Sequence, residues 1–380
     1  MVISRPDGSD RGRLSVDMMT AFARAQQQHR RACLLPPRVQ GHEALFALTS
    51  DDVTVVRPSG AARVQCLLRW WMTAAAHSVG ERVAAGAASF WQQLYIELRH
   101  HAGDERLPST LRGGLRRMAH DAFSRSAHAT SVPHFPRRLL REQVTTRLPR
   151  ERQTEAELIA ATFGVPVGSR IVALEARTPL DPFGDAIDFL VASGCTVARI
   201  GSPVAGAIRR PGVVDLAGVG IPLLDVFVML ECDFLVCEST DMQLAAYLTN
   251  TPCLLLNAID PIASYPVRAD GLYTLRTPVH LDTGQHLAPS AMLEETYVRE
   301  RRNLGFRQTP ANEILAAVRE MHEGGRGDRV ETAAQSRFRM AVTDAAARLG
   351  RRVYAGLDWG ADEGFVGDGR LANVQAERAQ

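Results

Sequence analysis

Short apolar runs alternate with helical patterns throughout the second half of the chain, and no other feature constrains the fold as strongly. The apolar runs predict strands at residues 170–174, 195–200, 213–216, 234–237 and 253–256. The intervening and following segments predict helices at 184–192, 223–231, 241–248, 291–302, 310–322 and 331–353. Strands that are apolar on both faces and alternate with helices are typical of a parallel sheet covered on both sides. We therefore predict an α/β fold with a doubly wound parallel sheet.

The chain divides into four segments by composition, and its 380 residues suit about two domains. The expected segments are a polar N-terminal arm at 1–30, an N-terminal domain at 31–150, the sheet domain at 151–325, and a C-terminal helix and tail at 326–380. Short strands are predicted at 32–35 and 52–56, and an aromatic helical pattern over 61–126 makes the N-terminal domain helix-rich. The polar, arginine-rich stretch 138–153 is predicted to link the two domains.

All 44 basic residues are arginine, because the chain contains no lysine. This excludes mechanisms that need an ε-amine, such as the lysine of phosphate-binding loops, the ATP-site lysine of protein kinases and Schiff-base chemistry. Arginine remains as the cation that can bind phosphate or carboxylate, although codon bias accounts for most of its total. The formal net charge of +2 argues against a dedicated nucleic-acid binder.

The sequence carries no signal for secretion, a membrane span or a metal centre. The first residues lack an apolar signal segment, and Asp225 interrupts the longest apolar stretch, 219–230, which is shorter than the roughly 18 residues of a membrane span. The six cysteines form no CxxC pair and are predicted to be reduced core thiols. We therefore expect a cytoplasmic protein with no metal, which could form a homodimer.

Polar residues follow four of the predicted strands, where the carboxyl ends of a parallel sheet form a ligand site. These residues are Glu175 and Arg177 after the first strand, Arg199, Gly201 and Ser202 at the second, Glu238, Ser239, Thr240 and Asp241 after the fourth, and Asn257 at the fifth. Arginines, hydroxyls and acceptors at one rim favour a ligand with an anionic part and hydroxyl groups, such as a nucleotide sugar. For each arginine, a phosphate contact and a surface salt bridge both remain open.

Two loops are candidate sites by their position. Thr240 and Gln243 fit a capping box with Thr240 as N-cap. Free amides at this helix start favour a diphosphate, whereas the charge of Asp241 in the first turn would repel one, so a phosphate site and a merely capped helix stay equally open. Gly41 and His42 lie between a strand and a helix of the first domain, where His42 is either a general base facing a cleft or a structural histidine.

The stretch 169–257 contains SRIVALEART, GCTVARIGSP and LLDVFVMLECDFLVCESTDMQLAAYLTNTPCLLLN. It resembles a family of bacterial predicted glycosyltransferases found with surface-glycan and natural-product genes. The likeness continues through QTPANEILAAVREM at 308–321 and, more weakly, VQGHE at 39–43. It implies a GT-B architecture, in which two Rossmann-like domains face a cleft that binds a nucleotide sugar. The helix-rich N-terminal domain, with Gly41, would then lie on the acceptor side.

The resemblance implies donor contacts at matching positions. Arg177 matches the arginine of a His-x-Arg motif, and Arg199 and Gly201 match an Arg-x-Gly motif. Asp225 matches an acid that heads the following helix, and Asn257 matches an asparagine that closes the fifth strand.

Ser239 lies in a loop that is rich in serine and contains glycine in the family. This chain departs from the family pattern at two places. Glu175 replaces the usual histidine, and residues 237–241 lack the family's glycine. A Cβ and the charge of Asp241 therefore stand where backbone would approach a phosphate.

By the same resemblance, the chain would transfer a sugar from a nucleotide-sugar donor to a glycan or natural-product acceptor. Arginines and helix amides would stabilise the leaving diphosphate without a metal or cofactor. Retaining enzymes of this fold carry two glutamates with seven residues between them, but Ala246 follows Glu238 at that spacing. Inversion is therefore expected, with His42 or Glu175 as base. The alternatives are a sugar-nucleotide epimerase or hydrolase, in which Glu238 is the acid or base, and a catalytically silent binding protein.

Overall fold

A computed structural model of the chain describes mainly its second half. The described residues are 146–349 except 167, 204–205, 263, 301–302 and 325–329, then 365–367, and, nearer the N-terminus, residues 2–4, 15, 18–19, 21–22, 26, 32–34, 45, 47–50 and 55–56. A seven-stranded sheet in the order β14-β11-β10-β9-β6-β7-β8 forms the centre of the second half. Its strands are β6 (Ile171–Glu175), β7 (Thr196–Arg199), β8 (Val213–Asp215), β9 (Phe234–Cys237), β10 (Cys253–Ala258), β11 (Gly271–Leu275) and β14 (Phe365–Val366).

All neighbouring strands of this sheet are parallel. The chain enters at β6, adds β7 and β8 on one side, and then returns to add β9, β10 and β11 on the other. This is the doubly wound order, and its switch point lies between β6 and β9. The predicted α/β fold with a doubly wound parallel sheet is confirmed, and all five predicted strands are present.

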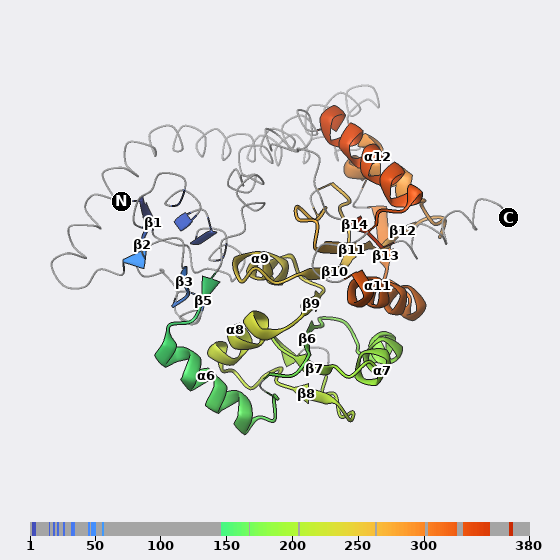
Figure 1. The fold of residues 1–380 in the computed structure, drawn as a ribbon. Helices are drawn as coiled ribbons and strands as arrows, with labels where there is room; N and C mark the ends of the chain where they lie inside the picture. The colour runs from blue at the N-terminus through green and yellow to red at the C-terminus, as the bar shows by residue number, and fades with distance from the viewer. Residues whose placement is uncertain are drawn as a thin grey trace, which may run out of the picture.

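Helices cover both faces of the sheet (Figure 1). One face carries α8 (Pro222–Glu231) and α9 (Thr240–Leu248), and the other carries α7 (Gly184–Ala192) and α11 (Ala311–Gly324). Within β6, Ala173 belongs to the first core, whereas Val172 and Leu174 belong to the second. Successive side chains of a strand point to opposite faces, so β6, β9, β10 and β11 contribute apolar side chains to both cores.

Two helical segments differ from the prediction. α6 (Arg150–Thr162) occupies the end of the predicted linker. The sequence pattern misses this helix because it is mostly polar, with Ala156 and Ala160 as its buried residues. The predicted helix at 291–302 is instead a 3-10 helix, η3 (Pro289–Leu293), and a short α10 (Glu295–Glu300). The two pieces are separate because the backbone at Glu294 is extended, with φ −94° and ψ 152°.

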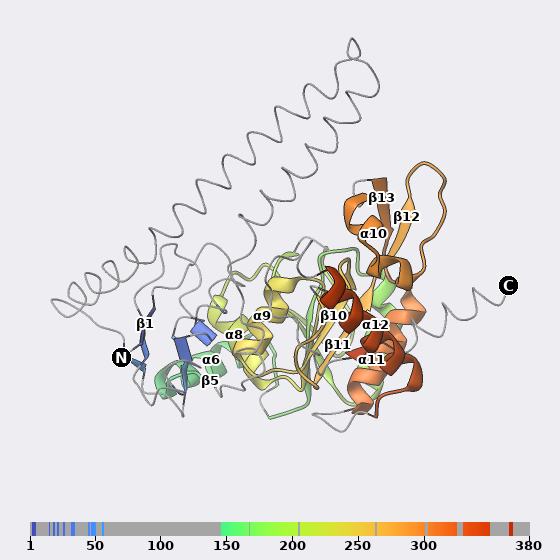
Figure 2. The ribbon, with the colours of Figure 1, turned by 90° about the horizontal axis from the view of Figure 1, so that it is seen from above.

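The C-terminal elements complete the sheet domain. β12 (Thr277–His280) and β13 (Leu304–Arg307) form an antiparallel pair that projects from the body (Figure 2). α12 (Ala333–Leu349) lies within the predicted range 331–353. A capping box marks the start of this helix, with Thr332 as N-cap. Thr332 Oγ1 accepts from Gln335 N at 3.2 Å, and Gln335 Oε1 accepts from Thr332 N at 2.9 Å.

The N-terminal region of the chain contains a second, smaller parallel sheet in the order β1-β2-β4. It is formed by β1 (Val2–Ser4), β2 (Ala32–Leu34) and β4 (Val55–Val56), while β3 (Thr49–Ser50) pairs with β5 (Thr146–Arg147). Thr146 Oγ1 donates to Leu248 O at 2.6 Å, which connects this region to the end of α9. The helical pattern at 61–126 lies outside the described residues, as do Gly41 and His42.

Four cysteines, Cys195, Cys232, Cys237 and Cys253, are buried free thiols, as predicted. The side chains of Cys33 and Cys66 lie outside the described part of the chain. Within the ranges given above, no helix combines the length and apolar character needed to cross a membrane.

Candidate functional site

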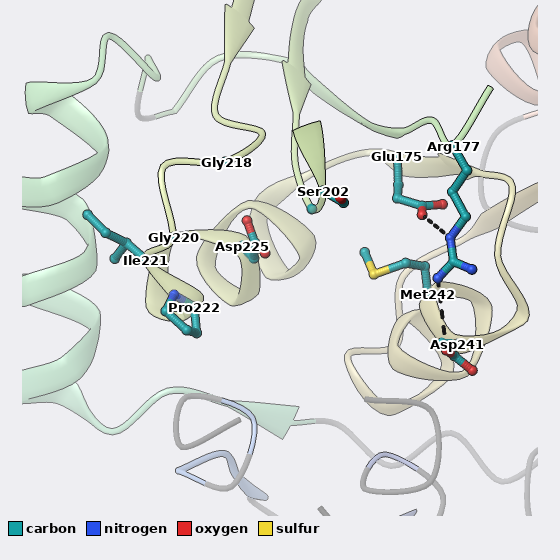
Figure 3. A pocket seen from close by; sticks show the side chains of 11 residues that line it. Glu175, Arg177, Ser202, Gly218, Gly220, Ile221, Pro222, Asp225, Asp241 and Met242 are labelled. Atoms are coloured by element: carbon teal, nitrogen blue, oxygen red, sulfur yellow. Dashed lines mark hydrogen bonds and ion pairs between the residues drawn. The ribbon is translucent and has the colours of Figure 1, made fainter. Parts of the chain in front are cut away.

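A pocket of about 310 Å³ opens at the carboxyl edge of the sheet, beside the switch point between β6 and β9. Ligands of open α/β sheets bind in the crevice that forms at such a point. The lining comes from four strand ends and from the loops and helix starts that follow them (Figure 3). It comprises Glu175 and Arg177 at the end of β6, Gly201 and Ser202 after β7, Gly218, Gly220, Ile221, Pro222 and Asp225 between β8 and the first turn of α8, and Asp241 and Met242 at the start of α9.

Arg177 is the one basic side chain among the described lining residues. Its Nε donates to Glu175 Oε1 at 3.0 Å, and its Nη2 lies 4.0 Å from Asp241 Oδ2, so the guanidinium sits between two carboxylates (Figure 3). The Arg177 side chain is 56% exposed, whereas the Glu175 side chain is 4% exposed. The Arg177 guanidinium is therefore accessible to a ligand, while the buried Glu175 carboxylate orients the guanidinium.

Glu238 lies beneath the pocket edge and is not among its lining residues. Its Oε2 accepts from the backbone amides of Arg177 at 2.6 Å and Thr178 at 2.8 Å. Its Oε1 accepts from Thr178 Oγ1 at 2.7 Å and from Asn257 Nδ2. Because both oxygens are occupied, the structure does not support the predicted acid or base role. Glu238 instead holds the β6, β9 and β10 strand ends together.

Asn257 continues this hydrogen-bonded cluster on the β10 side. It is buried, with a positive φ of 61°, and its Oδ1 accepts from Thr309 N at 2.8 Å. Its backbone N–H donates to Thr274 Oγ1 at 3.3 Å. Asn257 does not line the pocket, so the structure gives it a positioning role rather than the predicted donor contact.

Arg199 is not among the residues that line the pocket either. It is fully buried, and its Nη1 donates to Asp215 Oδ2 at 3.1 Å and to Gly206 O. Asp215 Oδ2 also accepts from Ile208 N at 2.8 Å. This buried ion pair fastens the loop after β7 to β8, and neither of the two readings from sequence, a phosphate contact or a surface salt bridge, describes it.

Three of the residues that line the pocket are glycines with a left-handed backbone. Gly201, Gly218 and Gly220 have φ angles of 86°, 83° and 74°, which only glycine adopts without strain. Gly218 N donates to Gly201 O at 3.2 Å and so joins the loops after β7 and β8. α8 then starts at Pro222, with Asp225 in its first turn.

The start of α9 differs from the predicted capping box. Ser239 is the N-cap, and its hydroxyl accepts from Met242 N at 3.3 Å. Thr240 is the first helical residue and is exposed, while Gln243 Nε2 donates to Tyr247 Oη at 3.2 Å instead of closing a box. Asp241 occupies the first turn, where a negative charge is favourable toward the helix dipole.

Two buried thiols of neighbouring strands lie close together in the core beside β9. Cys237 Sγ is 3.6 Å from Cys253 Sγ on the neighbouring strand. Burial, above all, raises the pKa of the Cys237 thiol well above its ordinary value, and the neighbouring Cys253 and Glu175 act in the same direction. Cys237 is therefore a neutral core thiol rather than a nucleophile.

The structure brings together five of the predicted site residues in one pocket: Glu175, Arg177, Gly201, Ser202 and Asp241. The lining residues that the prediction leaves out come mainly from the loop after β8. The signal for this loop was available, since the glycine-rich run GVGIP at 218–222 follows a predicted strand. Asp225, which the family resemblance matches to an acid at the head of the helix, also lines the pocket.

The described residues contain no group of three or more histidine, cysteine or acidic side chains arranged to hold a metal ion. No protein-family model matches the chain, and no curated protein matches it.

Two solved structures are similar to the chain over most of its length. ADP-heptose LPS heptosyltransferase II of E. coli is 12% identical, with 73% of this chain and 90% of that chain covered and a TM-score of 0.38. The glycosyl transferase family 9 protein of Veillonella parvula is 10% identical, with coverage of 72% and 80% and a TM-score of 0.35. Both of these neighbours are glycosyltransferases.

Proposed function

We propose that the chain is a glycosyltransferase that moves a sugar from a nucleotide-sugar donor to a glycan or natural-product acceptor, with inversion and without a metal. The observation that carries the proposal is the pocket at the switch point, whose lining combines Arg177, three glycines and carboxylates such as Asp225. An arginine suits a diphosphate, and carboxylates such as Asp225 suit the hydroxyls of a sugar or ribose. The resemblance of residues 169–257 supports the same reaction.

In this proposal Arg177 stabilises the negative charge that develops on the leaving diphosphate. Glu175 holds the guanidinium in place through its bond to Arg177 Nε. The other Glu175 oxygen accepts from Glu238 N at 3.0 Å, so both oxygens already have partners. Glu175 is therefore poorly placed to take a proton from an acceptor, and His42 remains the proposed base of the two candidates.

Arg177→Met tests the phosphate contact by calorimetric titration with UDP, GDP and ADP. We expect binding of the cognate nucleotide to weaken about 10- to 100-fold, because a hydrogen bond to a charged group contributes about 1.5–3 kcal/mol. Arg170→Met is the matched control. Arg170 precedes the same strand at its opposite end, pairs with Asp233 through a 3.0 Å bond, and is 53% exposed.

Absence of binding by all three nucleotides, or equal affinity of wild type and Arg177→Met, would overturn the proposal. Turnover then separates transfer from the alternatives. Donor consumption that requires an acceptor supports a transferase, whereas consumption without one supports an epimerase or hydrolase. His42→Ala should abolish turnover while leaving nucleotide affinity unchanged.

A further inference from the structure

The pocket holds more negative than positive charge before any ligand enters. Its described lining carries three carboxylates, Glu175, Asp225 and Asp241, and a single guanidinium, Arg177. Two of these carboxylates approach the guanidinium directly, so a phosphate must compete for it. For a site proposed to bind a diphosphate, this charge balance needs an explanation.

Glu175 and Asp241 differ in what they do for the fold. Glu175 is buried and also accepts from the backbone of Glu238, so it belongs to the framework of the strand ends. The Asp241 side chain is 47% exposed and approaches Arg177 at 4.0 Å from the opposite side. Figure 3 shows Asp241 facing the guanidinium from the start of α9. Of the two carboxylates beside Arg177, Asp241 is therefore the one whose charge acts more on a ligand of this guanidinium than on the fold.

We propose that Asp241 is a specificity-determining residue that favours a nucleotide sugar over the nucleoside diphosphate released from it. The inference rests on the proposed function and adds how the site separates donor from product. Asp241 repels the more highly charged of the two ligands and so promotes its release from Arg177.

The chemistry of the two ligands supplies the difference in charge. The terminal phosphate of a nucleoside diphosphate is a monoester-like group with a second ionisation near pH 6, so it gains a further negative charge at neutral pH. In a nucleotide sugar this oxygen is esterified and that ionisation is absent. A fixed carboxylate near the phosphates repels each ligand in proportion to its charge, so it weakens product binding more than donor binding.

The test measures affinities for three pairs of probes, UDP and UDP-glucose, GDP and GDP-mannose, and ADP and ADP-glucose, with wild type and Asp241→Asn. We expect Asp241→Asn to bind the cognate diphosphate about 2- to 5-fold more tightly, as for one charge at a helix start, and to bind the sugar ester with a smaller gain. Both gains should shrink at 1 M salt, where the screening length falls to about 3 Å.

Asp282→Asn is the control of equal charge. Asp282 is exposed in the connection between β12 and β13 and does not line the pocket, so this variant should keep wild-type affinities. Asp241→Ser provides a second variant that also retains a polar group at the first turn and should give the same gain.

Each outcome decides a different question. Equal or weaker diphosphate binding by both Asp241 variants, or an unchanged ratio of diphosphate to sugar-ester affinity, overturns the role of Asp241 and leaves the proposed function standing. Failure of wild type and variants to bind any of the six probes overturns the proposed function together with this inference.

Discussion

Arg177 and Arg199 belong to the carboxyl ends of adjacent strands, yet their environments are opposite. Arg199 is inside β7, paired in the ladder with Leu174 of β6, and Val197 two residues earlier packs under α7 and α11. The pleat directs Arg199 to that same face, where the loop after β7 covers it. Arg177 lies beyond the end of β6, so no pleat fixes its direction, and it reaches the pocket. A strand-end position thus does not decide whether an arginine meets a ligand.

The largest expected effect separates these two arginines by stability. Arg199→Met should lower the free energy of unfolding by about 3–5 kcal/mol, because Asp215 loses its buried partner. Arg177→Met should cost less, about 1–3 kcal/mol, because its guanidinium is 56% exposed and the buried Glu175 keeps the hydrogen bond from Glu238 N. Urea denaturation of both variants, followed by circular dichroism, measures the difference. Equal losses would show that the contrast in burial has no energetic counterpart.

Glu238→Gln tests the cluster that supports Arg177. The glutamine amide would face Asn257 Nδ2, also a donor, while Asn257 Oδ1 is already held by Thr309 N. We expect a loss of about 1–3 kcal/mol in stability from the mispaired amide at this half-buried position, with weaker nucleotide binding. Glu155→Gln, an exposed acid on α6, should be nearly neutral. Full turnover by stable Glu238→Gln would agree with positioning, whereas loss of turnover at unchanged affinity would restore a catalytic role.

Gly201→Ala probes the contact between the loop after β7 and Glu175, the buried partner of the exposed Arg177. A Cβ at φ 86° costs about 1–2 kcal/mol of backbone strain, and it would lie 3.3 Å from Glu175 Cγ. Gly194→Ala has the same strain, with φ 80°, but open space around the new atom. We therefore expect similar losses of stability from the two variants, measured in urea, but weaker nucleotide binding from Gly201→Ala alone. Unchanged affinity in Gly201→Ala would mean that Glu175 does not orient Arg177.

The smallest expected effect concerns an ion pair of intermediate exposure, Arg339 with Glu331, whose side chains are 34% and 21% exposed. The hydrogen bond from Arg339 lowers the pKa of Glu331. The ordinary pKa of a glutamate is about 4.3. A carboxylate whose pKa is lowered in the folded state stabilises the fold at pH values above that ordinary pKa. The contribution is lost as the pH falls through the lowered pKa.

Wild type should therefore exceed Glu331→Gln by less than about 1 kcal/mol at pH 7, and the two should converge in acid. Urea denaturation at a series of pH values measures this difference. A gap that persists in acid would assign it to packing rather than to charge. Glu155→Gln again serves as the exposed control.

Much of the sheet domain follows from local sequence. The apolar runs predict β6 to β10, and the helical periodicity predicts α7, α8 and α9 within one or two residues at their ends. These signals are local because burial on both faces of a parallel strand requires an unbroken apolar run. α6 shows the converse, since a polar helix with two buried alanines leaves almost no periodic signal.

The sequence predicted the sheet edge at which the pocket lies, but not which residues of that edge line it. Sequence order places Arg177, Arg199, Glu238 and Asn257 at strand ends, yet only the first lines the pocket. The roles of the others depend on partners far along the chain, such as Thr309 for Asn257 and Asp215 for Arg199. No local pattern records these pairings.

The sequence by itself determined the parallel sheet, the edge at which the pocket opens, and the absence of any lysine from its chemistry. The tertiary structure decided which polar residues of that edge line the pocket. The physical reason is that strand pleat and loop closure together set the direction of each side chain. Arg199 and Glu238 are thereby engaged in holding the loops, whereas Arg177 and Asp241 remain exposed to whatever the pocket binds.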